Sequence, residues 1–235
     1  MRILLVLLAI TEMVQAQPVV MVGLDLTQSM AQPGYDGRTE LDRAWADLAG
    51  VIQTLPAGAD FTIAAITDKS FSQPLVLSTR RLPRDRGPLQ FLDQVSAAKS
   101  RILAEARNRA PGLRFAQTDV LGFLVYASDA LKNVQPRSKI LVILSDMRQS
   151  TMDLDFDTPA TIDIAAALRA VEQRRLVADL REVEVYVGNV HATGKSPAYW
   201  EALRQFWSSY FKKSGANLRT FSMHLNVPLT PANGQ

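Results

Sequence analysis

Short apolar runs alternate with longer stretches of helical period along most of the chain. The runs predict strands at Val19–Leu24, Phe61–Ile66, Lys139–Leu144, Glu182–Val187 and Leu218–Met223. The amphipathic stretches predict helices near residues 40–54, 88–109, 118–132, 160–179 and 197–213. This alternation is typical of an α/β fold, and we expect a three-layer, doubly wound and mostly parallel sheet with helices on both faces.

Two segments refine this picture. Gln73–Ser78 predicts a short strand at the edge of the sheet, because Pro74 cannot donate a ladder hydrogen bond. The last helix carries an aromatic stripe between Tyr199 and Phe211 that includes two of the three tryptophans. We expect this stripe to dock on the sheet, and its width leaves open that part of it faces a partner.

The two ends of the chain differ from the middle. One arginine precedes the eight apolar residues Ile3–Ile10, and Val14-Gln15-Ala16 offers a small-residue cleavage site. We therefore expect residues 1–16 to be a signal peptide and the protein to be periplasmic or secreted. The alternative is a buried strand in a cytoplasmic protein. Residues 17–225 form the expected single domain, and residues 226–235 an expected flexible tail.

Composition excludes several classes of protein. The chain of 235 residues is 47% hydrophobic and 21% charged, as in ordinary globular domains, and no transmembrane anchor is expected from an apolar run this short. The absence of cysteine rules out disulfides, zinc-thiolate sites and a cysteine nucleophile. A net charge of +3 does not indicate nucleic-acid binding. Residues 80–114 nevertheless hold nine basic groups against three acidic ones, which could attract an anionic surface.

Hydroxyl and carboxylate side chains follow two of the predicted strands. Asp25, Thr27 and Ser29 come directly after the first strand, Asp146 follows Lys139–Leu144, and Thr118 opens a helix. Ligands of doubly wound sheets bind outside the carboxyl ends of the strands, where the strand order reverses. We therefore expect these five side chains to converge there.

This arrangement resembles the von Willebrand factor A domain and its metal-ion-dependent adhesion site. The family pattern is Asp-x-Ser-x-Ser after the first strand, a Thr in a later loop and an Asp after the fourth strand. Thr27 replaces the first Ser and keeps its hydroxyl. The resemblance covers roughly residues 18–223. It implies a non-enzymatic domain that captures an acidic side chain of a partner protein through Mg²⁺, or through Mn²⁺ or Ca²⁺.

The residue types also suit a hard cation on chemical grounds. Mg²⁺ takes oxygen ligands in near-octahedral geometry at ~2.1 Å and keeps part of its water. The hydroxyls of Thr27, Ser29 and Thr118 could bind it directly, while Asp25 and Asp146 act through water or by orienting the hydroxyls. A cation with few anionic ligands keeps enough charge to attract a carboxylate. The same residue types also form ordinary caps and turns, so a scaffold with a vestigial site stays open.

An enzyme is the alternative from a different class. Phosphatases similar to haloacid dehalogenases place a nucleophilic Asp after the first strand, where Asp25 stands, and Thr27 fits one variant of their motif. The second acidic residue that these enzymes need is missing beside Asp146. The acidic run Asp153–Asp157 departs from a calcium loop, and we expect it to rim the crevice or to be solvated. His191 is expected to be an exposed loop residue.

Overall fold

The computed structural model describes residues 17–33, 36–84, 90–110, 115–132, 134, 138–158, 161–191, 194–225 and 227–228. The expected signal peptide, residues 1–16, lies outside these residues. Of the expected tail, residues 226–235, only 227 and 228 are described. None of the described helices combines the length and apolar character needed to cross a bilayer.

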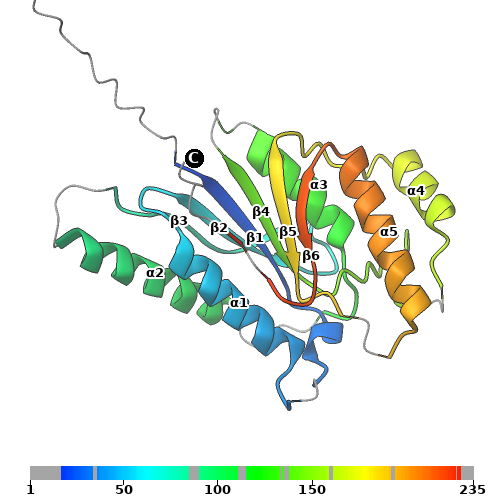
Figure 1. The fold of residues 1–235 in the computed structure, drawn as a ribbon, viewed down its shortest axis with the longest axis horizontal. Helices are drawn as coiled ribbons and strands as arrows, with labels where there is room; N and C mark the ends of the chain where they lie inside the picture. Colours follow the sequence, from blue (N-terminus) through cyan, green and yellow to red (C-terminus); the bar gives the residue numbers. More distant parts are fainter. Residues whose placement is uncertain are drawn as a thin grey trace, which may run out of the picture.

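A single sheet of six strands forms the centre of the molecule (Figure 1). The strands are β1 (Val19–Asp25), β2 (Asp60–Ile66), β3 (Leu75–Arg81), β4 (Lys139–Leu144), β5 (Val183–Gly188) and β6 (Asn217–Phe221). Their spatial order is β3-β2-β1-β4-β5-β6, and only β3 runs antiparallel to its neighbour. The order reverses between β1 and β4, which confirms the predicted doubly wound, mostly parallel sheet.

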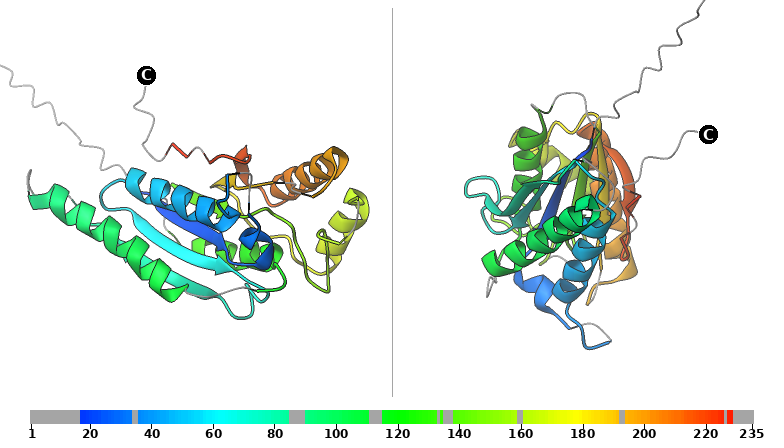
Figure 2. Two further views of the ribbon diagram at one scale, coloured as in Figure 1. Left: turned by 90° about the horizontal axis from the view of Figure 1, so that it is seen from below. Right: turned by 90° about the vertical axis from the view of Figure 1, so that its left-hand side faces the viewer.

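Helices cover both faces of this sheet (Figures 1 and 2). They are α1 (Glu40–Thr54), α2 (Gln90–Arg109), α3 (Val120–Lys132), α4 (Ile164–Gln173) and α5 (Pro197–Lys213), with a 3₁₀ turn η1 at Gln28–Ala31. Buried residues of α1 and α2 share one apolar core, and those of α3, α4 and α5 share the other. The sheet therefore separates two cores, as the three-layer prediction requires.

Strand β1 lies in the middle and contributes to both cores. Val20, Val22 and Leu24 join the core under α1, while Met21 joins the core under α3. Gly23 also faces α3, and a Cβ there would lie 2.5 Å from the ring of Phe123. The missing side chain therefore lets α3 approach the centre of the sheet closely.

Most predicted bounds agree with the structure to within two residues, and two elements differ by more. The helix predicted over 160–179 is shorter, because Asp163 caps its start by accepting a 2.9 Å hydrogen bond from the amide of Ala166. The helix ends before Arg175, because the φ of this residue is 58° and a right-handed helix needs a negative φ. The edge strand is confirmed as an edge, but it begins after Pro74 and runs three residues further than predicted, to Arg81.

Most of the aromatic stripe of α5 is buried, as predicted. Six of its side chains are buried, namely Tyr199, Leu203, Phe206, Trp207, Tyr210 and Phe211. Trp200, on the flank of the stripe, is half-buried, and its ring centroid lies 5.9 Å from that of Phe221 of β6. The stripe is wide because α5 packs against α4 as well as against β6 of the sheet, and a partner surface at its flank stays a prediction.

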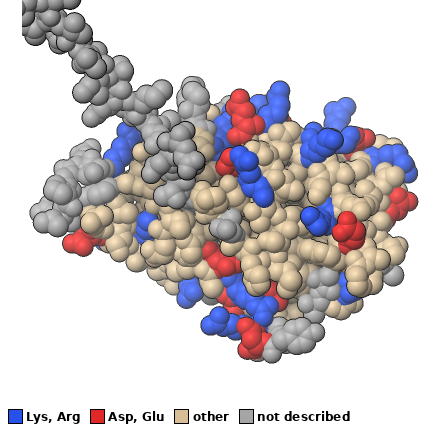
Figure 3. All heavy atoms as spheres, viewed as in Figure 1, with Lys and Arg blue, Asp and Glu red and all other residues tan. Residues whose placement is uncertain are grey.

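Part of the basic segment 80–114 is paired with acidic side chains. Arg80 and Arg109 both pair with Glu105, Arg81 pairs with Asp60, and Arg107 lies over the ring of Trp45. Figure 3 shows basic and acidic side chains interspersed on the face that it draws. Binding of an anionic surface by this segment stays a prediction.

Candidate functional site

Three loops meet at the carboxyl edge of the sheet, beside the switch between β1 and β4. The first follows β1 and carries Thr27 and Ser29, and the second follows β4 and carries Asp146. Thr118, which precedes α3, exchanges two backbone hydrogen bonds of 3.1 and 2.8 Å with Ser150 of the second loop. This short bridge holds the start of α3 against the loop after β4.

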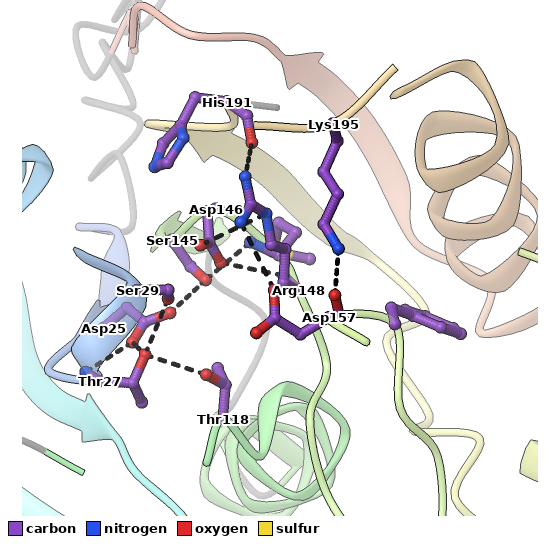
Figure 4. Close-up of polar contacts among 12 residues, drawn as sticks. Asp25, Thr27, Ser29, Thr118, Ser145, Asp146, Arg148, Asp157, His191 and Lys195 are labelled. Atoms are coloured by element: carbon purple, nitrogen blue, oxygen red, sulfur yellow. Dashed lines mark hydrogen bonds and ion pairs between the residues drawn. The ribbon is translucent and has the colours of Figure 1, made fainter. Parts of the chain in front are cut away.

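The hydroxyl groups of Thr27, Ser29 and Thr118 converge on one point (Figure 4). Thr27 Oγ1 lies 3.2 Å from Ser29 Oγ and 2.9 Å from Thr118 Oγ1. Adjacent ligands of an octahedral Mg²⁺, each ~2.1 Å from the metal, stand about 3 Å apart. The spacing therefore matches two edges of such an octahedron, and because hydroxyl hydrogens rotate, the lone pairs can turn toward a shared cation.

Asp25 lies behind the hydroxyls and orients them. One carboxylate oxygen accepts hydrogen bonds from the amide (2.9 Å) and the hydroxyl (2.7 Å) of Thr27, and the other accepts one of 2.5 Å from the hydroxyl of Ser145. The side chain is completely buried. Burial, and next the nearby charge of Asp146, raise the pKa of Asp25 to about 7, although its three hydrogen bonds act in the opposite direction.

Asp146 holds a buried carboxylate oxygen that lacks a hydrogen bond from the described residues. It is completely buried, and its Oδ1 accepts a 3.0 Å hydrogen bond from the amide of Arg148. Its Oδ2 has no hydrogen-bond partner among the described residues and lies 3.8 Å from Arg148 Nε. Leaving a buried carboxylate oxygen unsatisfied is costly, so this atom suits a cation or a water bound to one.

The backbone directly after Asp146 is strained. Met147 has a φ of 62°, which is uncommon for a residue with a side chain. The surroundings hold it there, because its amide donates to Ser145 Oγ (2.9 Å) and its carbonyl accepts from the indole of Trp207 (2.9 Å). Strain of this kind is maintained where the geometry of a loop matters.

A cleft of about 510 Å³ opens over these groups. Its wall includes Ser29 and Thr118, while Asp25 and Asp146 lie behind them with no exposed surface. A ligand in the cleft would therefore meet hydroxyl oxygens first. The carboxylates would act from behind, as the sequence predicts.

Several residues of this cleft were missed or misjudged from the sequence. Arg148, whose side chain is 9% exposed, lies between Asp146 and Asp157, and its Nη1 is 3.5 Å from the Asp157 carboxylate (Figure 4). His191 lines the cleft and is 4% exposed, so the expectation of an exposed loop residue was wrong. Asp157 confirms that the acidic run reaches the rim. Arg148 stands only two residues after Asp146 in the sequence, and this closeness could have indicated that it belongs to the site.

The geometry does not favour the phosphatase alternative. A carboxylate nucleophile must reach its substrate, yet Asp25 has no exposed surface and both its oxygens accept hydrogen bonds. It is placed to orient Thr27 and Ser145. Among the described residues, no three His, Asp or Glu side chains gather as a metal site, so the candidate donors are mainly hydroxyls.

Comparisons with known proteins place this architecture. No family model and no curated protein matches the sequence. Among solved structures, the pilus adhesin SpaC from Lactobacillus rhamnosus GG is similar, with a TM-score of 0.50 and 12% identity over 89% of this chain. The D319A mutant of the PilB minor pilin from Streptococcus sanguinis has a TM-score of 0.50 and 13% identity over 88% of it. A von Willebrand factor type A protein from Catenulispora acidiphila has a TM-score of 0.43 and 15% identity over 91%.

The chain has a von Willebrand factor A-like fold. The chain spans 29% of the adhesin's length, 57% of the pilin's and 39% of the Catenulispora protein's. At these identities the likeness extends to the fold, so the chemistry of the von Willebrand factor A-like site has to be argued from its own residues.

Proposed function

We propose that this von Willebrand factor A-like domain binds a divalent cation at Asp25, Thr27, Ser29, Thr118 and Asp146 and through it captures a protein partner. The observation that carries the proposal is the spacing of the three hydroxyl oxygens, beside a buried carboxylate oxygen of Asp146 that has no hydrogen-bond partner among the described residues. Mg²⁺ is the first choice, with Mn²⁺ or Ca²⁺ as substitutes, because every donor is a hard oxygen.

The residues have separate roles in this proposal. Thr27, Ser29 and Thr118 would face the cation, and Asp25 and Ser145 would hold Thr27 in place from behind. Asp146 would supply the charge nearest to the cation on the β4 side. A bound divalent cation would offer an open coordination position to a carboxylate, which makes an acidic side chain of the partner the natural ligand.

The protein's location and partner belong to the same proposal. Two similar solved structures are those of a pilus adhesin and a minor pilin, which supports a binding role in place of catalysis. We place the protein in the periplasm or outside the cell on the basis of the expected signal peptide. A partner that offers an acidic side chain in an exposed loop fits the open cleft.

Titration calorimetry of the full chain with Mg²⁺ and with Mn²⁺ tests the proposal. We expect one site per chain, and we expect Asp146→Asn to weaken binding at least tenfold because it removes one of the two buried negative charges behind the hydroxyls. Asp153→Asn is the matched control, since Asp153 lies in the same loop with its side chain 66% exposed and pairs with Arg174. No heat with either cation, or equal binding by both variants, would contradict the proposal.

A further inference from the structure

The side of the cleft next to the hydroxyl cluster is built from two nitrogen-bearing side chains. Arg148 follows β4 and His191 follows β5, and these strands are neighbours in the sheet. The guanidinium donates a 3.4 Å hydrogen bond to the backbone carbonyl of His191 (Figure 4). Both residues line the cleft that also contains Ser29 and Thr118.

His191 is in an unusual state for a buried side chain. It is 4% exposed, and neither ring nitrogen has a hydrogen-bond partner among the described residues. Buried polar atoms in folded proteins are nearly always satisfied, and each exception asks for a ligand, an ion or a water. Since the ring borders the cleft, a ligand in the cleft could form a hydrogen bond with a ring nitrogen.

We propose that Arg148 and His191 form an anion subsite that holds the partner's carboxylate next to the cation. The inference rests on the proposed function and adds the residues that would select the ligand. Arg148 offers a planar fork of N–H donors that suits carboxylates, and His191 offers a ring nitrogen. One carboxylate oxygen would face the hydroxyl cluster and the other would face this subsite.

The charge around the subsite favours a carboxylate over a phosphate. Asp146 and Asp157 lie 3.8 and 3.5 Å from nitrogens of the Arg148 guanidinium, so two carboxylates face its single positive charge. The ammonium of Lys195 binds the backbone carbonyl of Asp157 and lies over the ring of Tyr199. A dianion would need more uncompensated positive charge than this wall holds, whereas a monoanion can use the directional N–H groups.

Nuclear magnetic resonance of the histidine rings tests this subsite directly. The chain has two histidines, His191 and the exposed His224, so ring signals can be assigned with His191→Gln and His224→Gln. The probe is the peptide acetyl-Gly-Glu-Gly-amide with Mg²⁺ present, and acetyl-Gly-Gln-Gly-amide is its uncharged match. We expect the Glu peptide to shift the His191 ring signals and leave those of His224, and the Gln peptide to shift neither.

A second variant separates this inference from the proposed function. Arg148→Lys keeps the charge but loses the fork, and we expect it to weaken the Glu peptide at least threefold while Mg²⁺ affinity by calorimetry stays within twofold. Glu-peptide binding seen at Ser29 and Thr118 without a response of His191 would overturn the subsite and leave cation-dependent capture intact. So would unchanged peptide affinity in Arg148→Lys.

The converse outcome is equally clear. If the Glu peptide shifts the His191 signals but neither Mg²⁺ nor Mn²⁺ gives heat on titration, the subsite is supported and the proposed cation site is overturned. No ring or amide response to either peptide, with Mg²⁺ bound, would overturn the subsite.

Discussion

Asp25 and Asp146 are two buried carboxylates that interact with each other, and the guanidinium of Arg148 lies 3.8 Å from Asp146. Neither side chain is exposed to solvent, and the repulsion between the two charges contributes to the raised pKa of Asp25. Hydrogen bonds from Thr27 and Ser145 compensate Asp25 in part. At the scale of single residues, the cation-free site stores unfavourable charge that a divalent cation would relieve.

This stored charge predicts an inverted pH dependence of stability. In the unfolded chain Asp25 has an ordinary pKa near 3.8, and in the folded protein its pKa is about 7, so the folded state binds the proton more tightly. Without a cation, the free energy of unfolding is expected to fall as the pH rises from about 4 to 7, by up to ~1.4 kcal/mol per unit. Urea denaturation in EDTA at pH 5 and pH 8 measures this.

Two comparisons make that pH prediction specific. Asp25→Asn, which cannot ionise, should flatten the dependence, while Asp153→Asn should keep it. Excess Mg²⁺ should reverse the trend, since the cation competes with the proton for the same carboxylates. The contrary result is a free energy of unfolding that rises between pH 5 and 8 in EDTA, with the same pH dependence in Asp25→Asn. It would show that the pKa of Asp25 is not raised in the folded protein.

At the scale of elements, the start of α3 positions Thr118. Asp119, the next residue, accepts a 2.9 Å hydrogen bond from the amide of Gly122, and its own amide donates to Thr67 (2.8 Å). A Cβ on Gly122 would lie 2.0 Å from Asp119 Oδ2. The cap therefore needs glycine at this position to close.

Alanine at Gly122 is predicted to break this cap. We expect Gly122→Ala to lower the free energy of unfolding by about 1–2 kcal/mol and to weaken Mg²⁺ binding by displacing Thr118. Gly50→Ala is the matched control in α1, where a Cβ meets nothing within 4 Å and should stabilise by ~0.5–1 kcal/mol. Thermal and urea denaturation measure both, and equal effects at the two glycines would refute the steric account.

The end of α4 offers a test of the strain at Arg175. This exposed residue has a φ of 58° just beyond the helix, a conformation that glycine adopts without cost. Arg175→Gly is predicted to raise the free energy of unfolding by roughly 1 kcal/mol. Arg175→Ala removes the same side chain but keeps the Cβ, so it should give no such gain; a gain in both variants would assign the effect to the lost charge.

At the scale of the whole molecule, the strand order explains why residues more than a hundred positions apart share one site. The carboxyl ends of β1 and β4 are neighbours because the chain reverses its winding between them. Alternation of apolar and polar segments predicted this topology, and the position of Asp25, Thr27, Ser29, Thr118 and Asp146 at strand and helix ends predicted their convergence.

The remaining parts of the site could not be predicted in the same way. His191 stands in a polar stretch with no periodicity, and it is buried because the loops after β4 and β5 pack on each other. The ion pair of Arg148 with Asp157 joins residues of one irregular loop. Local pattern indicates which residues end an element, but not how an irregular loop folds back over it.

We propose above all that one cation is shared by the hydroxyls of Thr27, Ser29 and Thr118. A crystal structure of the full chain grown with Mn²⁺, with anomalous scattering data, measures this directly. We expect an anomalous peak about 2.1–2.3 Å from all three oxygens, with Asp25 and Asp146 close behind. Crystals soaked to saturation that show no peak at these oxygens, or show one only elsewhere, would contradict it.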